Sequence, residues 1–408
     1  MSQMKAMSGG RSLLVLLMLI YAVNQLDRNI LSIALPGIRA EFHLGDGALG
    51  LLTGPAFALV YVLLGIPLAM LADRGRAHIV IAGSLAVFSV MTILSGAAGN
   101  FTHLLAARMG VGIGEAGSAP ALNAVIATRF PAEKRSGALS VYSAGANLGL
   151  LLAFFGGGLV MQHWGWRATL MAAGVPGLLL MLLFLAGTRQ TAPAAMPARA
   201  PLGETVRFLW SQIGFRLLAL GSGLASIGGF AGVAFVPSLL SRSYHMAPAQ
   251  IGLMLALLVG IGGFFGTMLP GLLSDRLGCR DGLYTAMMVI LAWMPSHLLL
   301  CLASDARLML VGLALTAFFV SSWLGPALAA AQIIAPDRTR AQTAALLLAA
   351  LNLIGMAAGP LLVGIVSDIL QPHLGEDALR YALAAAVAPA PFAIWCFAAA
   401  RRIARVPA

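Results

Sequence analysis

Two stretches of the sequence repeat one another and indicate how the chain is organised. Pro131–Asn147 reads PAEKRSGALSVYSAGAN, and Pro336–Asn352 reads PDRTRAQTAALLLAALN. A proline, an arginine and an asparagine recur in them at a spacing of 205 residues, and Asp73-Arg74 recurs as Asp275-Arg276 at a spacing of 202 residues. Correspondences at nearly one offset predict that the chain contains two copies of one structural unit.

The composition outside these stretches is typical of a membrane protein. Of the 408 residues, 60% are hydrophobic and only 10% are charged, and the mean hydropathy is +0.92. A soluble domain has about 25% charged residues, so the composition excludes a soluble enzyme, a disordered chain and a disulfide scaffold. Cys279, Cys301 and Cys396 lie far apart and lack the spacing of metal ligands. We therefore expect no disulfide, no metal site and no cofactor.

The hydrophobic pattern predicts an all-α integral membrane protein with twelve transmembrane helices in two pseudo-symmetric six-helix bundles. Each crossing needs about 20 apolar residues, and helices satisfy their own backbone groups in lipid. The longest loop, residues 188–212, contains the sequence TAPAAMPARAP. It separates an N-terminal bundle, residues 1–187, from a C-terminal bundle, residues 213–408. The expected spans are 12–36, 47–72, 78–98, 101–128, 136–161, 167–187, 213–241, 247–273, 282–303, 307–334, 341–367 and 378–400.

The distribution of basic residues predicts the orientation in the membrane. With both termini cytoplasmic, the inner segments carry 18 Lys and Arg residues and the outer segments carry five. Cytoplasmic loops of membrane proteins are enriched in these residues. We therefore expect a multi-pass protein of a bacterial-type plasma (inner) membrane with both termini inside. The net charge of +11 is then a property of the loops and does not indicate nucleic-acid binding.

Four charged residues fall inside predicted spans and are the candidates for chemistry. They are Asp27 and Arg28 in the first span and Arg108 and Glu115 in the fourth. Ionisable side chains within a membrane mark substrate or ion pathways unless they form structural ion pairs between helices. Burial and a nearby guanidinium act in opposite directions on the pKa of a carboxyl group. Asp27 and Glu115 are therefore candidate proton-coupling residues, and Arg28 and Arg108 are candidates for binding an anion.

The loop motif at the second repeat resembles that of the major facilitator superfamily. It reads Gly271-Leu-Leu-Ser-Asp275-Arg276-Leu-Gly278-Cys-Arg280, and its first-half counterpart, Ala69-Met-Leu-Ala-Asp73-Arg74-Gly75-Arg76, lacks the leading glycine and one residue. The resemblance covers nearly the whole chain. It implies a secondary transporter that works by alternating access, with two parallel repeats around a central site. Asp73, Arg74, Asp275 and Arg276 are then expected to gate the conformational change.

Three further segments resemble the Spinster-like branch of that superfamily. They begin at Asp27-Arg28, at Arg108 with the pattern Arg-Met-Gly-Val-Gly-Ile-Gly-Glu115, and at Gly359-Pro360. Animal members of this branch export sphingosine phosphate or lysolipids. The anion:cation symporters share a similar Asp-Arg pair and a similar Arg…Glu pattern. The proton-driven drug antiporters usually have a Gly-Pro motif in the fifth span, which this chain lacks.

The resemblance and the buried charges together predict a proton-coupled transporter of an amphipathic, lipid-like or organic anionic substrate. The C-terminal half has no buried charge by this assignment, and we expect Phe230, Trp323 and Asn352 to contact the apolar part of the substrate. The alternatives are a proton-coupled symporter of small organic anions such as sugar acids, and a drug exporter. An enzyme would need a nucleophile, base or metal cluster, and the sequence shows no such cluster, so we do not expect an enzyme. The other expected partners are protons and the lipid bilayer, and the protein is expected to act as a monomer.

Overall fold

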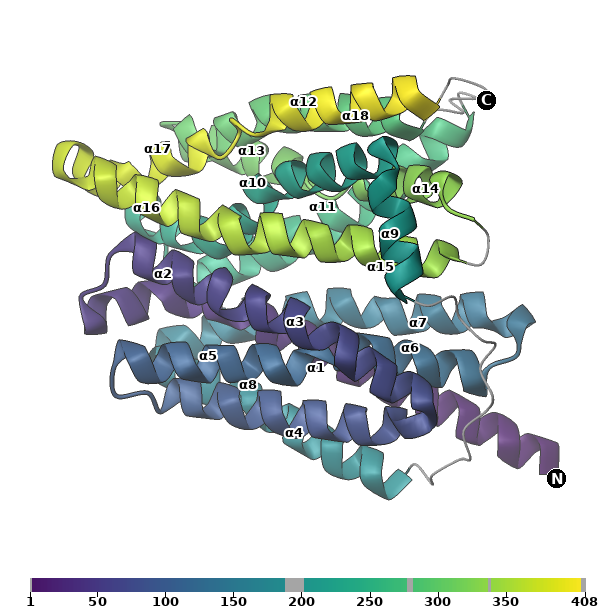
Figure 1. Ribbon diagram of the computed structural model, residues 1–408. Coiled ribbons are helices and arrows are strands. Elements are labelled where there is room, and N and C mark those ends of the chain that lie inside the picture. Colours follow the sequence, from purple (N-terminus) through teal and green to yellow (C-terminus); the bar gives the residue numbers. More distant parts are fainter. Residues whose placement is uncertain (1, 188–201, 277–281, 337–338, 405–408) are drawn as a thin grey trace. The chain divides into compact units, whose positions relative to one another are not determined.

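The computed structural model describes residues 2–187, 202–276, 282–336 and 339–404, and within these ranges every regular element is a helix (Figure 1). Nine described stretches are long and apolar enough to cross a membrane, and two of them, of 51 and 62 residues, are long enough for two crossings. These stretches account for eleven crossings. The α5–α6 segment, which carries Arg108 and Glu115, accounts for the twelfth. The predicted all-α membrane fold with twelve crossings is confirmed.

The helices of the first half follow the predicted spans closely. They are α1 (Ser2–Phe42), α2 (Asp46–Thr53), α3 (Pro55–Leu71), α4 (Ala77–Gly96), α5 (Phe101–Ala116), α6 (Ser118–Arg129), α7 (Ala132–Leu151) and α8 (Gly157–Gly187), with π-helices η1 (Ala72–Arg76) and η2 (Leu152–Gly156). Inside α8, Gly165 has a φ of +75°, a conformation that glycine adopts readily. This glycine marks the boundary between the fifth and sixth crossings.

The second half repeats this pattern after a short helix, α9 (Leu202–Ser211). Its helices are α10 (Ile213–Tyr244), α11 (Pro248–Arg276), α12 (Gly282–Leu302), α13 (Ala306–Phe319), α14 (Leu324–Ile334), α15 (Arg340–Leu351), η4 (Asn352–Met356), α16 (Ala357–Leu374), η5 (Gly375–Asp377), α17 (Ala378–Ala385) and α18 (Ala390–Ala404). The π-helices η2 and η4 occupy corresponding crossings of the two halves. Single-turn π-helices often occur at functional sites.

The helices group into two compact units. Unit 1 comprises residues 1–44, 56–196 and 246–256, and unit 2 comprises residues 45–55, 197–245 and 257–408. The two units therefore do not divide simply at the linker: residues 45–55 precede it but belong to unit 2, and residues 246–256 follow it but belong to unit 1. Each half of the sequence therefore contributes one short segment to the other unit.

Unit 1 is held together by close helix packing around α1 and α4. Helix α1 packs on α7 and α8, and α4 packs on α5 and α8. A side chain at Gly145 or Gly149 of α7 would collide with the backbone of Met18 or Ala22 of α1. Small residues allow backbones to approach this closely in membranes, where van der Waals packing drives helix association.

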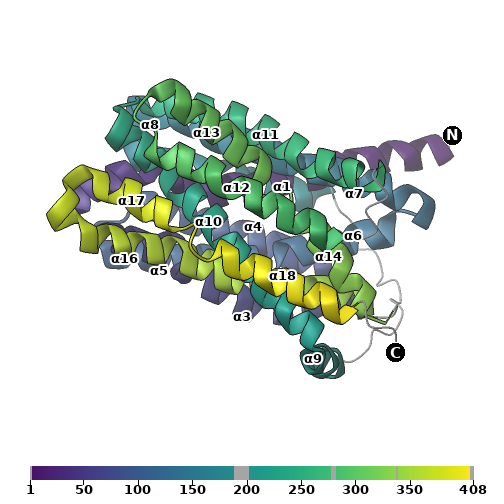
Figure 2. The same cartoon turned by 90° about the horizontal axis from the view of Figure 1, so that it is seen from above.

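Unit 2 has a core formed by residues of α10, α12, α14, α15 and α18; of these helices, α10, α12, α14 and α18 are labelled in Figure 2. The side chains of Phe215, Trp293 and Phe397 are buried there. His297 of α12 stacks on Trp293, and its Nε2 lies 3.1 Å from the carbonyl oxygen of Leu383 near the end of α17. This contact places the imidazole against an interhelical carbonyl group, as expected for a polar group satisfied inside a helix bundle.

The short segment that the first half contributes to unit 2 is fixed by a buried ion cluster. Arg242 of α10 donates two hydrogen bonds, of 2.7 and 2.8 Å, to the carboxylate of Asp46 at the start of α2. Ser367 of α16 donates to the same carboxylate at 2.7 Å. Asp368 accepts the backbone N–H groups of Asp46 and Gly47 at 2.7 and 2.8 Å. We call Asp46, Arg242, Ser367 and Asp368 the α2 cluster.

Helix α9 lies against the ends of α10 and α15 (Figure 1). Leu209 is fully buried, and the hydroxyl of buried Thr205 donates to Oε1 of Gln342 at 2.5 Å. Trp210 is 60% exposed. One face of this linker helix is thus fixed to unit 2.

Candidate functional site

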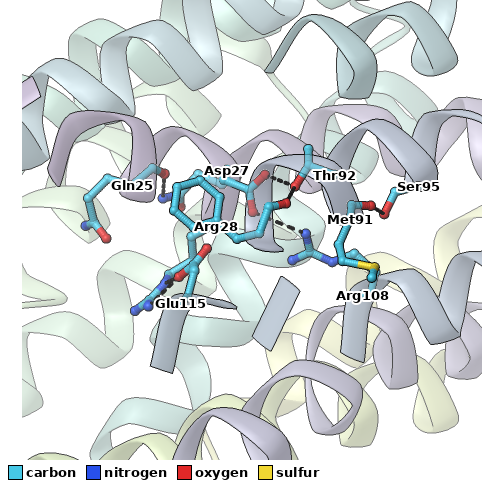
Figure 3. Close-up of polar contacts among 10 residues, drawn as sticks. Gln25, Asp27, Arg28, Met91, Thr92, Ser95, Arg108 and Glu115 are labelled. Carbon is cyan, nitrogen blue, oxygen red and sulfur yellow. Dashed lines mark hydrogen bonds and ion pairs between the residues drawn. The ribbon is translucent and has the colours of Figure 1, made fainter. Parts of the chain in front are cut away.

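The four charges predicted inside the membrane lie together in unit 1. Asp27 and Arg28 are on α1, and Arg108 and Glu115 are on α5 (Figure 3). Asp27, Arg108 and Glu115 are 0%, 2% and 1% exposed. The structure therefore brings these residues into one buried group, which we call the charge cluster.

The ion pairs of the charge cluster cross between the two helices. Arg28 donates from Nη2 at 2.7 Å and from Nε at 3.1 Å to Oε2 of Glu115. Arg108 approaches Asp27 less closely, because Nη1 lies 3.8 Å from Oδ2. That distance allows ionic attraction but no hydrogen bond. One pair is therefore tight and hydrogen-bonded, and the other is loose.

The charge cluster leaves several buried polar atoms without a hydrogen bond. Oδ2 of Asp27 and both Nε and Nη1 of Arg108 have no hydrogen-bond partner, and neither has Oε1 of Glu115. Oδ1 of Asp27 contacts the hydroxyl of Thr92 on α4. Buried polar atoms in folded proteins are rarely left unpaired, and such exceptions are places where a proton, water or ligand can bind.

Aromatic rings cover the two guanidinium groups. Cζ of Arg28 lies 5.2 Å from the ring centre of Phe57 and 4.9 Å from that of Tyr61, and Cζ of Arg108 lies 5.7 Å from the Phe57 ring. Tyr21 and Tyr142 stack with their ring centres 4.4 Å apart. Cation–π contacts stabilise positive charges by about 2 kcal/mol when the charge is desolvated.

Glycines and a helix break position the charges on α5. A Cβ atom at Gly112 would lie 2.9 Å from the carbonyl oxygen of Phe57, and one at Gly114 would collide with the backbone of Phe88. The glycine pattern thus packs α5 against α3 and α4. The helix stops at Ala116, directly after Glu115, and α6 resumes at Ser118. Pro120 explains the break, because it has no N–H to continue the helix.

Several residues of this site were not found by reasoning from the sequence. Thr92, Phe57, Tyr21, Tyr61 and Tyr142 carry no charge and belong to no motif that we identified. The available signal was weak: each is a polar or aromatic residue inside an apolar span. Only the helix packing shows which of them reach the charge cluster.

The residues predicted in the second half lie in unit 2 and differ in exposure. Phe230 of α10 is partly buried beside Gly355, and Asn352 begins the π-helix η4. Trp323 is only 4% exposed, donates its indole N–H to the carbonyl oxygen of Val320 at 2.9 Å, and belongs to the core of unit 2. We therefore treat Trp323 as a core residue and do not propose that it contacts the substrate.

The predicted gating residues are only partly described. Arg74 is exposed in η1, where Gly75 has a φ of +83°. The side chains of Asp73, Asp275 and Arg276 lie outside the described part of the structure. Their gating role therefore stays a prediction from the sequence.

Comparison with known proteins identifies the family. A family model described as Major Facilitator Superfamily matches residues 17–218 and 218–407. The chain belongs to the major facilitator superfamily. It is accordingly a multi-pass membrane transporter and not an enzyme.

Individual members of the superfamily resemble the chain over most of its length. An "MFS-type efflux pump" of Mycolicibacterium smegmatis is 33% identical over 380 residues, which cover 91% of this chain and 88% of that protein. The crystal structure of a bacterial homologue of the human lysosomal transporter Spinster, inward-facing and unoccupied, has a TM-score of 0.86 and 26% identity, and the match covers 97% of both chains. The Spinster-like branch is therefore confirmed.

A third relative matches a shorter region. A protein of Bacillus subtilis named "Probable galactarate/D-glucarate transporter GudP" is 30% identical over 176 residues, which cover 42% of this chain and 38% of that protein. The relatives of this major facilitator protein thus include one named for efflux and one named for sugar acids.

Proposed function

We propose that this transporter couples the movement of an organic anion to protons, and that Asp27 is the carboxyl group that binds the proton. The observation that carries this proposal is the difference between the two ion pairs of the charge cluster. Glu115 accepts two hydrogen bonds from Arg28, whereas Asp27 accepts none from Arg108. Protonation of Asp27 therefore breaks no charge-assisted hydrogen bond between the paired groups.

The distances give the size of this difference. With an effective dielectric constant of about 20, attraction between unit charges is about 6 kcal/mol at the 2.7 Å of the Arg28–Glu115 pair and about 4 kcal/mol at the 3.8 Å of the Arg108–Asp27 pair. Neutralising Asp27 thus forfeits about 2 kcal/mol less than neutralising Glu115. Asp27 is the carboxyl group that releases its ion pair more easily.

The charge balance of the cluster sets the sign of the coupling. Two cations and two carboxylates are neutral together, and protonation of Asp27 leaves one positive charge in excess in a buried site. An anionic ligand restores neutrality, so the anion and the proton favour each other's binding and move in the same direction. A cationic ligand would instead compete with the proton.

Arg28 is the charged group that a ligand in unit 1 reaches most easily. Its side chain is 24% exposed, whereas the side chains of Arg108, Asp27 and Glu115 are at most 3% exposed. A planar guanidinium group binds carboxylates and phosphates with two parallel hydrogen bonds. We therefore propose that Arg28 contacts the anionic group of the substrate. Arg108 supplies the positive charge that balances the ionised Asp27.

The substrate class follows from the same groups and from the relatives. The aromatic rings beside Arg28 suit an amphipathic anion, and the sugar-acid name of the Bacillus subtilis relative supports a small organic anion as the alternative. The efflux name of the mycobacterial relative favours export as a second candidate function. Export of the anion in exchange for protons would require that the anion and the proton weaken each other's binding.

Transport into proteoliposomes tests the proposal. The probes are D-glucarate and lysophosphatidylglycerol, after a thermal-shift measurement has shown which one binds the folded protein. A pH gradient, acidic outside, should drive accumulation by the wild type and not by Asp27→Asn, which should retain exchange without a gradient. Asp377→Asn is the matched control, because that side chain is 57% exposed. Equal accumulation by Asp27→Asn and wild type would refute the assignment.

We also propose the placement of the chain in a bacterial-type inner membrane, with both termini cytoplasmic and the protein acting as a monomer. The excess of Lys and Arg in alternate loops supports the orientation. A reporter enzyme that is active on only one side of the membrane, fused after residue 408, tests it.

A further inference from the structure

Thr92 links the proton-binding carboxyl group to the backbone of α4. It is fully buried, and its hydroxyl oxygen lies 2.9 Å from the carbonyl oxygen of Phe88 and contacts Oδ1 of Asp27 (Figure 3). A hydroxyl group has one proton to donate and two lone pairs that accept. The number of hydrogen bonds that Thr92 can make here therefore depends on what its neighbours offer.

The two protonation states of Asp27 give different hydrogen bonds. An ionised carboxylate only accepts, so Thr92 then faces two acceptors and can donate to one of them. A protonated Asp27 can donate to Thr92 while Thr92 donates to Phe88, and both contacts become hydrogen bonds. When the proton leaves, the hydroxyl must turn from Phe88 toward Asp27 to satisfy the carboxylate.

The uncharged group that faces the Asp27 carboxyl in the described part of the chain is the Thr92 hydroxyl, and the carboxyl of Glu115 lies beside it. Oδ2 of Asp27 has no hydrogen-bond partner, and the charged groups around the carboxyl are Arg108 and Glu115 on α5 and Arg28 on α1. Arg108 is 3.8 Å away, and Arg28 and Glu115 are bonded to each other. Thr92 is thus the described hydroxyl group that contacts Asp27.

We infer that Thr92 is a positioning residue for proton coupling, whose hydroxyl reverses its hydrogen bond with Asp27 each time the proton binds or leaves. This inference rests on the proposed function, because it requires Asp27 to exchange a proton. The hydroxyl holds the carboxyl group in one place in both states. It also sets the pH at which the proton leaves, since the ionised carboxylate depends on it for a hydrogen bond.

Infrared difference spectroscopy between low and high pH tests the inference on the purified full-length protein. The C=O band of the protonated carboxyl group, assigned by its loss in Asp27→Asn, is followed in Thr92→Val, Thr92→Ala and Thr92→Ser. Valine has the shape of threonine without the hydroxyl. We expect the band to move to higher frequency in Thr92→Val and Thr92→Ala, and its half-titration point to move to higher pH by about one unit, because a hydrogen bond to a charged group is stronger than one to a neutral group.

Two controls separate the hydroxyl from general packing effects. Thr92→Ser retains the hydroxyl and should titrate as the wild type does. Thr169→Val removes a buried hydroxyl that donates to the carbonyl oxygen of Gly165, four residues earlier, as Thr92 does to Phe88. It should leave the band unchanged.

The possible results distinguish this inference from the proposed function. An unshifted band in Thr92→Val and Thr92→Ala, or an equal shift in Thr92→Ser, would overturn the role of Thr92 while leaving Asp27 as the proton site. A spectrum in which Asp27→Asn removes no titrating band would instead refute the proposed function. If Thr92→Val does not fold, Thr92→Ala gives the same comparison.

Discussion

Replacing Arg242 with methionine should strongly destabilise unit 2, because it removes the only cation of the α2 cluster. The side chains of Arg242 and Asp46 are 10% and 2% exposed, and two hydrogen bonds of 2.7 and 2.8 Å join them. An exposed ion pair contributes about 0–1 kcal/mol. Removing one partner of a buried pair costs about 3–5 kcal/mol, because the other charge stays buried without compensation. Asp368 adds a second carboxylate at the site, so we expect the upper part of that range.

A double-mutant cycle measures this pair without the other effects of the substitutions. The free energy of unfolding is measured by tryptophan fluorescence in mixed micelles for Arg242→Met, Asp46→Asn and the double variant. The double variant should regain part of the loss, because residue 46 is then no longer a buried charge without its cation, while Asp368 keeps its hydrogen bonds to the backbone N–H groups of residues 46 and 47. Asp377→Asn removes a carboxylate that is 57% exposed and lies 3.8 Å from Arg380, and should cost less than about 1 kcal/mol. A cost below about 1 kcal/mol for Arg242→Met, or strict additivity in the double variant, would contradict the reasoning.

Three further substitutions test the site and its supports. Arg28→Met should weaken binding of the anionic probe about tenfold to a hundredfold in a thermal-shift titration, because a charge-assisted hydrogen bond contributes about 1.5–3 kcal/mol; unchanged affinity would remove Arg28 from the binding site. Gly114→Ala should lower the free energy of unfolding by about 1–3 kcal/mol through collision with Phe88, whereas Gly83→Ala, which meets no atom within 4 Å, should not lower it. Trp323→Ala should cost about 3–5 kcal/mol of stability without making affinity depend on the apolar length of the ligand; a chain-length effect would restore its role in binding.

The fold was largely predictable from the sequence because each crossing is a long apolar run bounded by polar residues. The predicted span 213–241 corresponds to α10 at Ile213–Tyr244, and 282–303 corresponds to α12 at Gly282–Leu302. The exchange of short segments between the units was not predictable. Asp46 pairs with a residue 196 positions later in the chain, and its backbone with one 322 positions later. No local sequence pattern indicates contacts between residues so far apart in the chain.

The members of the charge cluster were predictable, but their pairing was not. A charge within an apolar run is conspicuous, and this alone identified Asp27, Arg28, Arg108 and Glu115. Adjacent residues on a helix point about 100° apart, so the partner of each residue depends on how α1 and α5 are rotated and cross. The same rotation brings Thr92 to Asp27. A hydroxyl in an apolar helix gives no signal of its own, because most such groups bond to their own backbone.

The most direct test of the account is the number of protons taken up when the anion binds. The purified protein in lightly buffered detergent solution is titrated with the anionic probe that binds it, while a pH indicator follows the proton concentration. We expect uptake of about one proton per bound anion by the wild type and by the exposed control Asp377→Asn, and none by Asp27→Asn, since the excess positive charge that the anion balances then exists without a bound proton. Proton release on binding, or unchanged uptake by Asp27→Asn, would contradict the account.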